Sequence, residues 1–84
     1  MIADAPPTNL LDEVHLARRI PTPAMRRAIR EAAGVSQDRL ARELGVQRVT
    51  VTRWELGIRR PRGVNAVRYV NLLSRIQIEL AGAA

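Results

Sequence analysis

The stretch that decides the fold runs from Ser36 to Pro61 and reads SQDRLARELGVQRVTVTRWELGIRRP. Its first half has the signals of a short helix, because Ser36 can cap the first turn and Asp38 complements the helix dipole there. Gly45 ends this helix after about two turns, since glycine accepts left-handed backbone angles at little cost. Three apolar residues fall on one face of the helix and form its predicted buried stripe: Leu40, Ala41 and Leu44.

A second short helix is predicted from about Arg48 to Leu56, closed by Gly57. At about 100° per residue, Val51 and Trp54 lie on one side of this helix and should face the core. The opposite side is short, basic and hydroxylated, and it carries Arg48, Val49, Thr52 and Arg53. Only about four residues separate the two helices, so they can cross sharply instead of lying antiparallel.

The outward side of the second helix has the chemistry to contact base edges in the major groove of DNA. Arg48 or Arg53 can grip guanine O6 and N7 with two hydrogen bonds, and the methyl groups of Val49 and Thr52 can touch a thymine methyl. A solvated face is the plainer interpretation of any single basic helix. The short connection between the helices, with the small residue Ala41 where they approach, favours base recognition here.

The flanking segments are also predicted to be helical. Thr22 and Pro23 are suited to begin a helix that ends at Gly34, and its apolar residues at helical spacing are Met25, Ala28, Ile29, Ala32 and Ala33. From about 63 to 80 one long helix is expected, with a narrow apolar seam of Ala66, Tyr69, Leu73, Ile76 and Leu80. Its first half should complete the core, while its second half has no obvious partner and suggests self-association.

The N-terminal part is expected to contain an arm and an extra helix. Residues 1–9 have no periodicity and are predicted to be a flexible arm. Residues 10–19 form a candidate helix, which the prolines of Ile20–Pro23 must end, and its apolar residues are Leu10, Leu11, Val14 and Ala17. We therefore expect an arm, 1–9, and a single domain, 10–84, built as an all-α bundle of four to five helices.

Composition narrows the possible functions. The chain has 84 residues, no cysteine and one histidine, His15, so no metal site and no catalytic set can be assembled; we expect no enzyme, no cofactor and no small-molecule ligand. Between Arg26 and Arg62 ten arginines face four acidic residues, an excess equal to the net charge of +6 for the whole chain. Such a segment favours polyanionic partners. With neither a signal peptide nor a membrane span in the sequence, the expected location is the cytoplasm, in association with the nucleoid.

Taken together, these residues resemble the Cro and phage-repressor class of helix-turn-helix proteins, often called the Xre family. The shared pattern covers about Met25 to Leu73 and consists of Gln37, Leu40, Ala41, Leu44, Gly45, Val46, Val51, Trp54, Glu55, Gly57 and Pro61. The resemblance implies a lambda-repressor-like DNA-binding domain whose third helix reads bases in double-stranded DNA. One departure is Gln47, which stands where the family usually has a serine or threonine cap.

The resemblance also implies a role for each site residue. The base-reading candidates are Gln47, Arg48, Val49, Thr52 and Arg53, and the phosphate-binding candidates are Gln37, Arg59, Arg60 and Arg62. Gln37 would also brace the third helix. Arg30 and Glu55 would pair between the first and third helices. Together with them, Ala41, Gly45, Val51 and Trp54 would have structural roles.

Two interpretations of the function follow. The first is a transcriptional regulator, with a repressor from a phage, prophage or bacterium as its expected form. The second keeps the fold but makes the chain an antitoxin or phage accessory protein whose main partner is another protein. A homodimer through the long C-terminal helix and residues 10–17 is compatible with both, although these two segments could instead cover each other within one chain.

Overall fold

In the computed structural model, which describes residues 10–11 and 20–82, the regular structure is helical throughout. The main helices are α2 (Pro23–Ala32), α3 (Gln37–Leu44), α4 (Arg48–Leu56) and α5 (Gly63–Gly82). The predicted all-α class is confirmed. Leu10 and Leu11 are helical and exposed. The rest of the expected helix over 10–19 and the expected arm over 1–9 lie outside the described residues.

Side-chain caps and left-handed residues set the bounds of the helices. The Oγ1 of Thr22 accepts a hydrogen bond from the Met25 amide at 3.2 Å, and the Oγ of Ser36 accepts one from the Arg39 amide at 3.0 Å. Gly45, with φ 71°, turns the chain from α3 into the loop before α4. A residue with a Cβ is strained at such an angle. The short connection between α3 and α4 therefore depends on a glycine at position 45.

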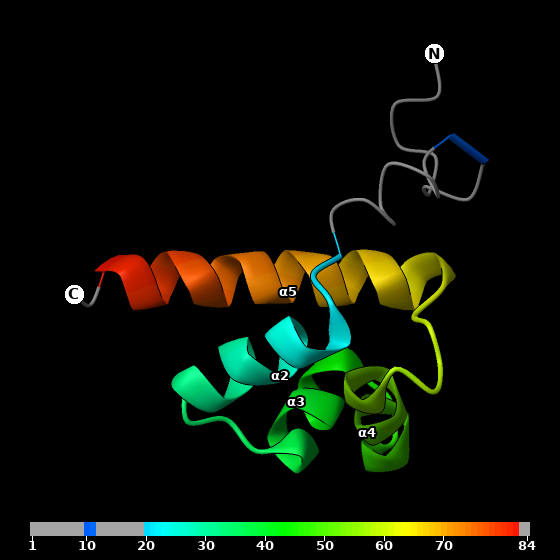
Figure 1. Ribbon diagram of the computed structural model, residues 1–84, viewed down its shortest axis with the longest axis horizontal. Helices are drawn as coiled ribbons and strands as arrows, with labels where there is room; N and C mark the ends of the chain where they lie inside the picture. Colours follow the sequence, from blue (N-terminus) through cyan, green and yellow to red (C-terminus); the bar gives the residue numbers. More distant parts are fainter. Residues whose placement is uncertain (1–9, 12–19, 83–84) are drawn as a thin grey trace.

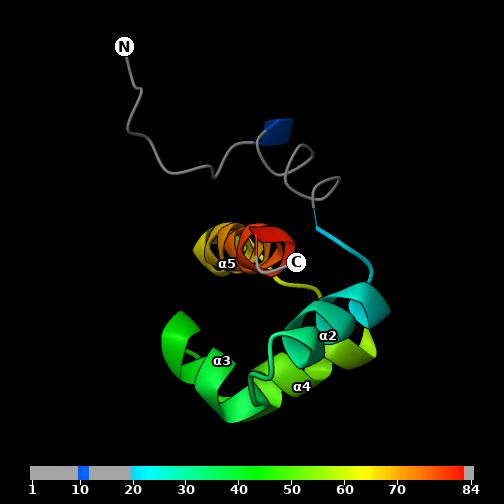
Figure 2. The same cartoon turned by 90° about the vertical axis from the view of Figure 1, so that its left-hand side faces the viewer.

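The four helices are arranged with α5 on one side and the other three on the opposite side. Figure 1 shows α5 running along one edge of the molecule, and the end view in Figure 2 shows α2, α3 and α4 together below it. Helix α4 packs against both α2 and α3, which in turn pack against α5. The core between them consists of Ile29, Leu40, Ala41, Leu44, Val51, Trp54, Tyr69 and Leu73.

Only some of the apolar residues that recur at helical spacing in α2 are buried. Met25 is 51% exposed, and the buried residues of this helix are Arg26, Ile29 and Arg30. The apolar spacing therefore marks only part of the buried face, because Ile29 is joined there by two guanidinium groups whose hydrogen-bond acceptors lie on other elements. The guanidinium groups of Arg26 and Arg30 both hydrogen-bond to residues outside α2.

Helix α5 continues beyond Leu73, its last buried residue. Ala66, Tyr69 and Leu73 of its predicted seam are buried, while Ile76 and Leu80 are only half-buried near the C-terminal end. Ile78 is 69% exposed on the same terminal turns. Within the described part of the chain, no helix combines the length and the apolar character needed to cross a membrane.

Candidate nucleic-acid interface

Helix α4 has one buried and one exposed side. Val51, Trp54 and Glu55 are buried, and the indole of Trp54 stacks on the Tyr69 ring with centroids 4.8 Å apart. Four of the candidate base-reading residues are exposed and Thr52 is half-buried; the exposed ones are Gln47, Arg48, Val49 and Arg53. The stacked aromatic pair thus packs the buried side of α4 against α5, and the other side of α4 is exposed to solvent.

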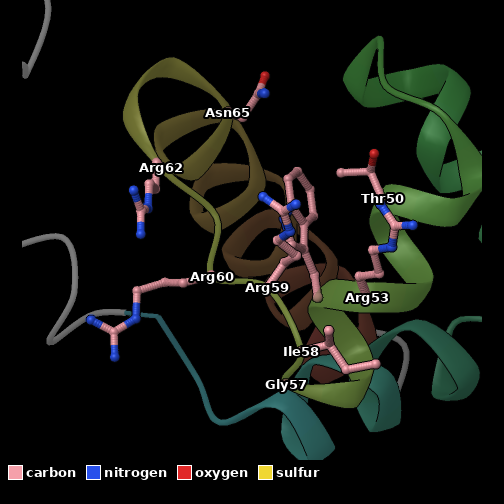
Figure 3. Close-up of a pocket in the computed structure, with 9 residues that line it drawn as sticks. Thr50, Arg53, Gly57, Ile58, Arg59, Arg60, Arg62 and Asn65 are labelled. Carbon is pink, nitrogen blue, oxygen red and sulfur yellow. The ribbon is translucent and has the colours of Figure 1, made fainter.

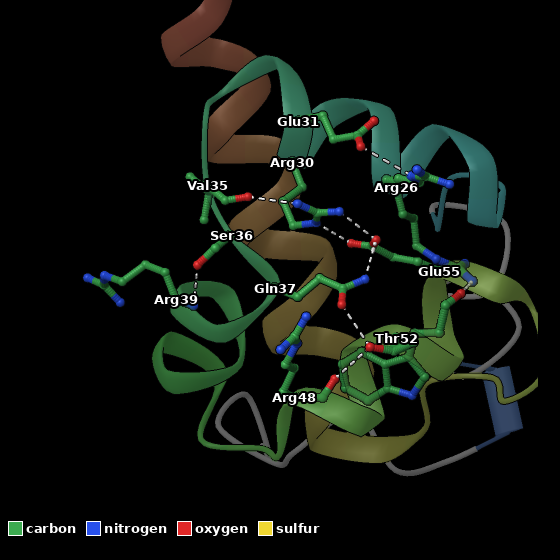
Figure 4. Close-up of polar contacts among 12 residues, drawn as sticks. Arg26, Arg30, Glu31, Val35, Ser36, Gln37, Arg39, Arg48, Thr52 and Glu55 are labelled. Atoms are coloured by element: carbon green, nitrogen blue, oxygen red, sulfur yellow. Dashed lines mark hydrogen bonds and ion pairs between the residues drawn. The ribbon is translucent and has the colours of Figure 1, made fainter.

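A buried polar network fixes α4 to α2 and α3 (Figure 4). Arg30 donates two hydrogen bonds to the Glu55 carboxylate, at 2.6 Å from Nε and 2.9 Å from Nη2, and a third to the Val35 carbonyl at 2.8 Å. Gln37 donates to the same carboxylate at 3.1 Å. This is the pair of charges, with its bracing glutamine, that the family resemblance implies.

The electrostatics of this network favour the charged forms of both partners. Burial alone would raise the pKa of the Glu55 carboxyl, but the hydrogen bonds from Arg30 and Gln37 outweigh it and hold that pKa below its ordinary value. The hydrogen bond to Glu55 raises the pKa of the Arg30 guanidinium. An ion pair with every strong donor and acceptor engaged is the form in which buried charges are tolerated.

Thr52 and Gln37 are linked to each other directly. The Thr52 hydroxyl donates to the Gln37 side-chain oxygen at 2.8 Å, and it also lies 3.2 Å from the carbonyl oxygen of Arg48. With its hydroxyl engaged inside the protein, Thr52 has its methyl group left for an apolar contact with a base. Gln37 therefore joins the start of α3 to the middle of α4.

Four arginines gather around one hollow beside α4, and Figure 3 shows them with their neighbours. The hollow has a volume of about 730 Å³, and Arg53 of α4 and the loop residues Arg59, Arg60 and Arg62 line it. Thr50 and Asn65 line it too, although sequence reasoning singled out neither. Thr50 lies three positions before Arg53 and so faces the same way on the helix, which is the signal that could have found it.

No carboxylate among the described residues lines this hollow. Glu31, Glu43 and Glu55 each pair with an arginine, and Asp38 lies 3.9 Å from the Nε of Arg48. In residues 20–82 no carboxylate pairs with the four arginines of the hollow. Positive charge is consequently concentrated where α4 meets the loop before α5, which suits a polyanion.

Comparison with known proteins agrees with this geometry. A family model described as helix-turn-helix matches residues 27–79, more than half of the chain. The matched span contains α3 and α4 in full and most of α2 and α5. No curated protein and no solved structure matches the chain.

Proposed function

The chain belongs to the helix-turn-helix family of the Xre and Cro type, and on that premise we propose that it reads a short DNA sequence with α4 in the major groove. Membership of this family makes it a DNA-binding regulator of the helix-turn-helix kind. One observation carries the finer proposal. The buried network of Arg30, Glu55 and Gln37 holds α4 in place with its basic side exposed, so the orientation of the helix is set before DNA binds.

Two sets of residues divide the work in the proposed complex. The base-reading set on α4 comprises Gln47, Arg48, Val49, Thr52 and Arg53. The phosphate-binding set comprises Gln37, Arg59, Arg60 and Arg62. Arg53 borders both sets because it lines the same hollow as the loop arginines. Contacts to phosphate set the register of the protein on the duplex, and only the contacts to base edges carry sequence information.

In this proposal the regulator is a repressor of phage, prophage or bacterial origin. It is located in the cytoplasm with the nucleoid. It binds a palindromic site as a symmetric dimer. Half-sites for such a pair lie about one helical turn apart, roughly 34 Å. The terminal turns of α5 support this assembly, because the apolar side chain of Ile78 is 69% exposed on them. The second candidate function is to bind a different protein, with the terminal turns of α5 as the contact surface.

Selection of bound duplexes from a random pool tests this function directly, since it reports sequence, symmetry and half-site spacing together. The selected duplex is then titrated with the native protein and with two variants. Arg48→Ala should relax base preference at one position at a cost of about 1–3 kcal/mol. Arg60→Ala should weaken binding to all duplexes alike. It should also reduce the slope of log affinity against log salt concentration by about one, because one phosphate contact is lost.

Two results would contradict the proposal. If the native protein enriches no duplex, sequence-specific DNA binding is wrong. If Arg48→Ala and Arg60→Ala lower affinity uniformly across sequences, the assignment of α4 as the reading helix is wrong. Purification of the protein from its native host, with identification of any protein that accompanies it, distinguishes the regulator from the protein-binding alternative.

A further inference from the structure

Arg26 is a buried arginine that joins three elements of the domain. Its side chain leaves α2 and is 5% exposed as a residue. Its Nη1 donates to the Pro21 carbonyl at 2.8 Å, and its Nη2 donates to the Trp54 carbonyl, in α4, at 2.7 Å. The guanidinium carbon lies 6.0 Å from the centroid of the Tyr69 ring on α5. The fork of one guanidinium therefore connects the start of α2, the end of α4 and the middle of α5.

The Trp54 carbonyl is one of the last in α4 and needs a partner from outside the helix. Carbonyls in the final turn have no amide ahead of them in the same helix. Gly57, the residue after α4, approaches the Trp54 carbonyl only to 3.4 Å. Arg26 supplies the shorter hydrogen bond, and its charge stands at the negative end of the α4 dipole.

The same guanidinium lies beside the start of the arginine loop, residues 58–62. Arg26 lines a hollow of about 290 Å³ together with Ile20, Pro23, Gly57 and Arg60. Gly57 is so near Pro23 that an added Cβ would lie 3.3 Å from the proline Cγ. The place where α4 ends and the arginine loop begins is thus held against the first turn of α2, with Arg26 beneath it.

The charge of Arg26 also affects where Arg60 can go. No carboxylate of residues 20–82 pairs with Arg26. Burial lowers the pKa of the Arg26 guanidinium, Tyr69 and Glu55 oppose this effect, and the charge of Arg60 makes a smaller contribution in the same direction as burial. Two like charges repel each other more strongly in the low-dielectric interior of a protein than in water. An Arg60 side chain that turned into the hollow would meet this repulsion, which favours the exposed position that it occupies.

From these contacts we propose that Arg26 is a positioning residue for DNA binding. It fixes the end of α4 and the start of the arginine loop, and it keeps Arg60 directed outward without touching DNA itself. The inference rests on the proposed function, because it assigns Arg26 to the placement of residues that bind phosphate there. It differs from a purely structural role in one measurable respect: the contribution of Arg26 to affinity passes through Arg60.

A double-mutant cycle between Arg26 and Arg60 tests the proposal on the full chain. Arg26→Met should weaken binding to the selected duplex and to unrelated duplexes alike, by about tenfold. In an Arg60→Ala background the same substitution should cost only about twofold, since the contact that it positions is already absent. The matched control is Arg27→Met, which removes the same charge from the next residue of α2. Arg27 is exposed and paired with Glu31, so its effect should be equal in both backgrounds.

The result that overturns the proposal is an Arg26→Met protein, folded by circular dichroism at the assay temperature, that keeps full affinity or loses affinity equally in both backgrounds. If Arg26→Met does not fold, Arg26→Lys decides, because it keeps the charge but cannot reach both carbonyls as a fork. Arg26→Lys should lower the affinity for DNA in the native background and change it little in the Arg60→Ala background. If Arg26→Lys keeps full affinity in the native background, the proposal is contradicted. Failure of the native protein to select any duplex contradicts the proposed function instead.

Discussion

The side chain of Glu55 shows how one residue can support function from inside the core. It is 2% exposed and receives hydrogen bonds from Arg30 and Gln37, which come from two different helices. Removal of this carboxylate would leave the Arg30 charge buried without its counterion. The exposed face of α4 thus depends on a residue that DNA never contacts in the proposed complex.

Glu55→Gln should lower the free energy of unfolding at neutral pH by about 3 kcal/mol, because a buried ion pair loses one partner. The folded-state pKa of Glu55 lies below the ordinary value of 4.5. Its stabilisation is therefore complete above that value and is lost as the pH falls through the folded-state pKa. Thermal melts from pH 7 to pH 3 should show this acid loss in the native protein and much less of it in the variant.

Glu43→Gln is the matched control for that experiment, since Glu43 is exposed in its pair with Arg39. An exposed ion pair contributes little to stability, so this variant should melt like the native protein at every pH. Equal changes in the two variants would show that the buried pair has no special role.

Among the elements, α3 and α4 begin in different ways. The Ser36 side chain caps α3, whereas Gln47 at the start of α4 forms no side-chain cap hydrogen bond. The first turn of α4 is therefore held by tertiary contacts, among them Val46, which packs against the core. This is the departure from the family pattern that Gln47 already indicates in the sequence.

Ser36→Ala should lower the free energy of unfolding by about 1 kcal/mol, and Gln47→Ser should raise it by a similar amount. The corresponding shifts in the thermal midpoint are about 4–8 °C in opposite directions for a domain of this size. Scanning calorimetry of the two variants measures both. A midpoint for Gln47→Ser that equals the native one would mean that the first turn of α4 gains nothing from a cap.

At the scale of the whole molecule, α5 is the element that reaches beyond the core. Ile76 packs against the core and Leu80 is half-buried, whereas Ile78, on the opposite side of these turns, is exposed. The exposed Ile78 side chain is the surface that the proposed dimer interface would bury. The expected interface over 10–17 lies outside the described residues, apart from Leu10 and Leu11.

Light scattering at micromolar concentration should give a mass twice the 9.4 kDa of one chain. Ile78→Glu should reduce that mass to one chain, and circular dichroism should show that each chain keeps its fold, because the side chain is already exposed in one chain. Gln77→Glu, an equally charged change at the neighbouring exposed position, should leave the dimer intact. A single-chain mass for the native protein, with and without DNA, would exclude the symmetric model.

Sequence reasoning was most accurate where a feature depends on a few neighbouring residues. The caps at Thr22 and Ser36 and the left-handed turn at Gly45 follow from local hydrogen bonds and backbone angles. The division of α4 into a face with Val51 and Trp54 and an exposed basic face follows from helical periodicity, which is also local.

The tertiary structure alone decided that Arg26 is buried and which arginines lie together around the hollow. Met25 belongs to the apolar residues at helical spacing, yet it is exposed and Arg26 is buried, because the Arg26 guanidinium reaches the carbonyls of Pro21 and Trp54, which lie outside α2. The meeting of Arg53 with Thr50 and the loop arginines likewise depends on how α4 and α5 are joined in space. The stretch from Ser36 to Pro61 by itself determined the two short helices and the basic face of the second. The buried contacts from Arg26 and Arg30 determined how that face is held, because burial depends on partners distant in sequence.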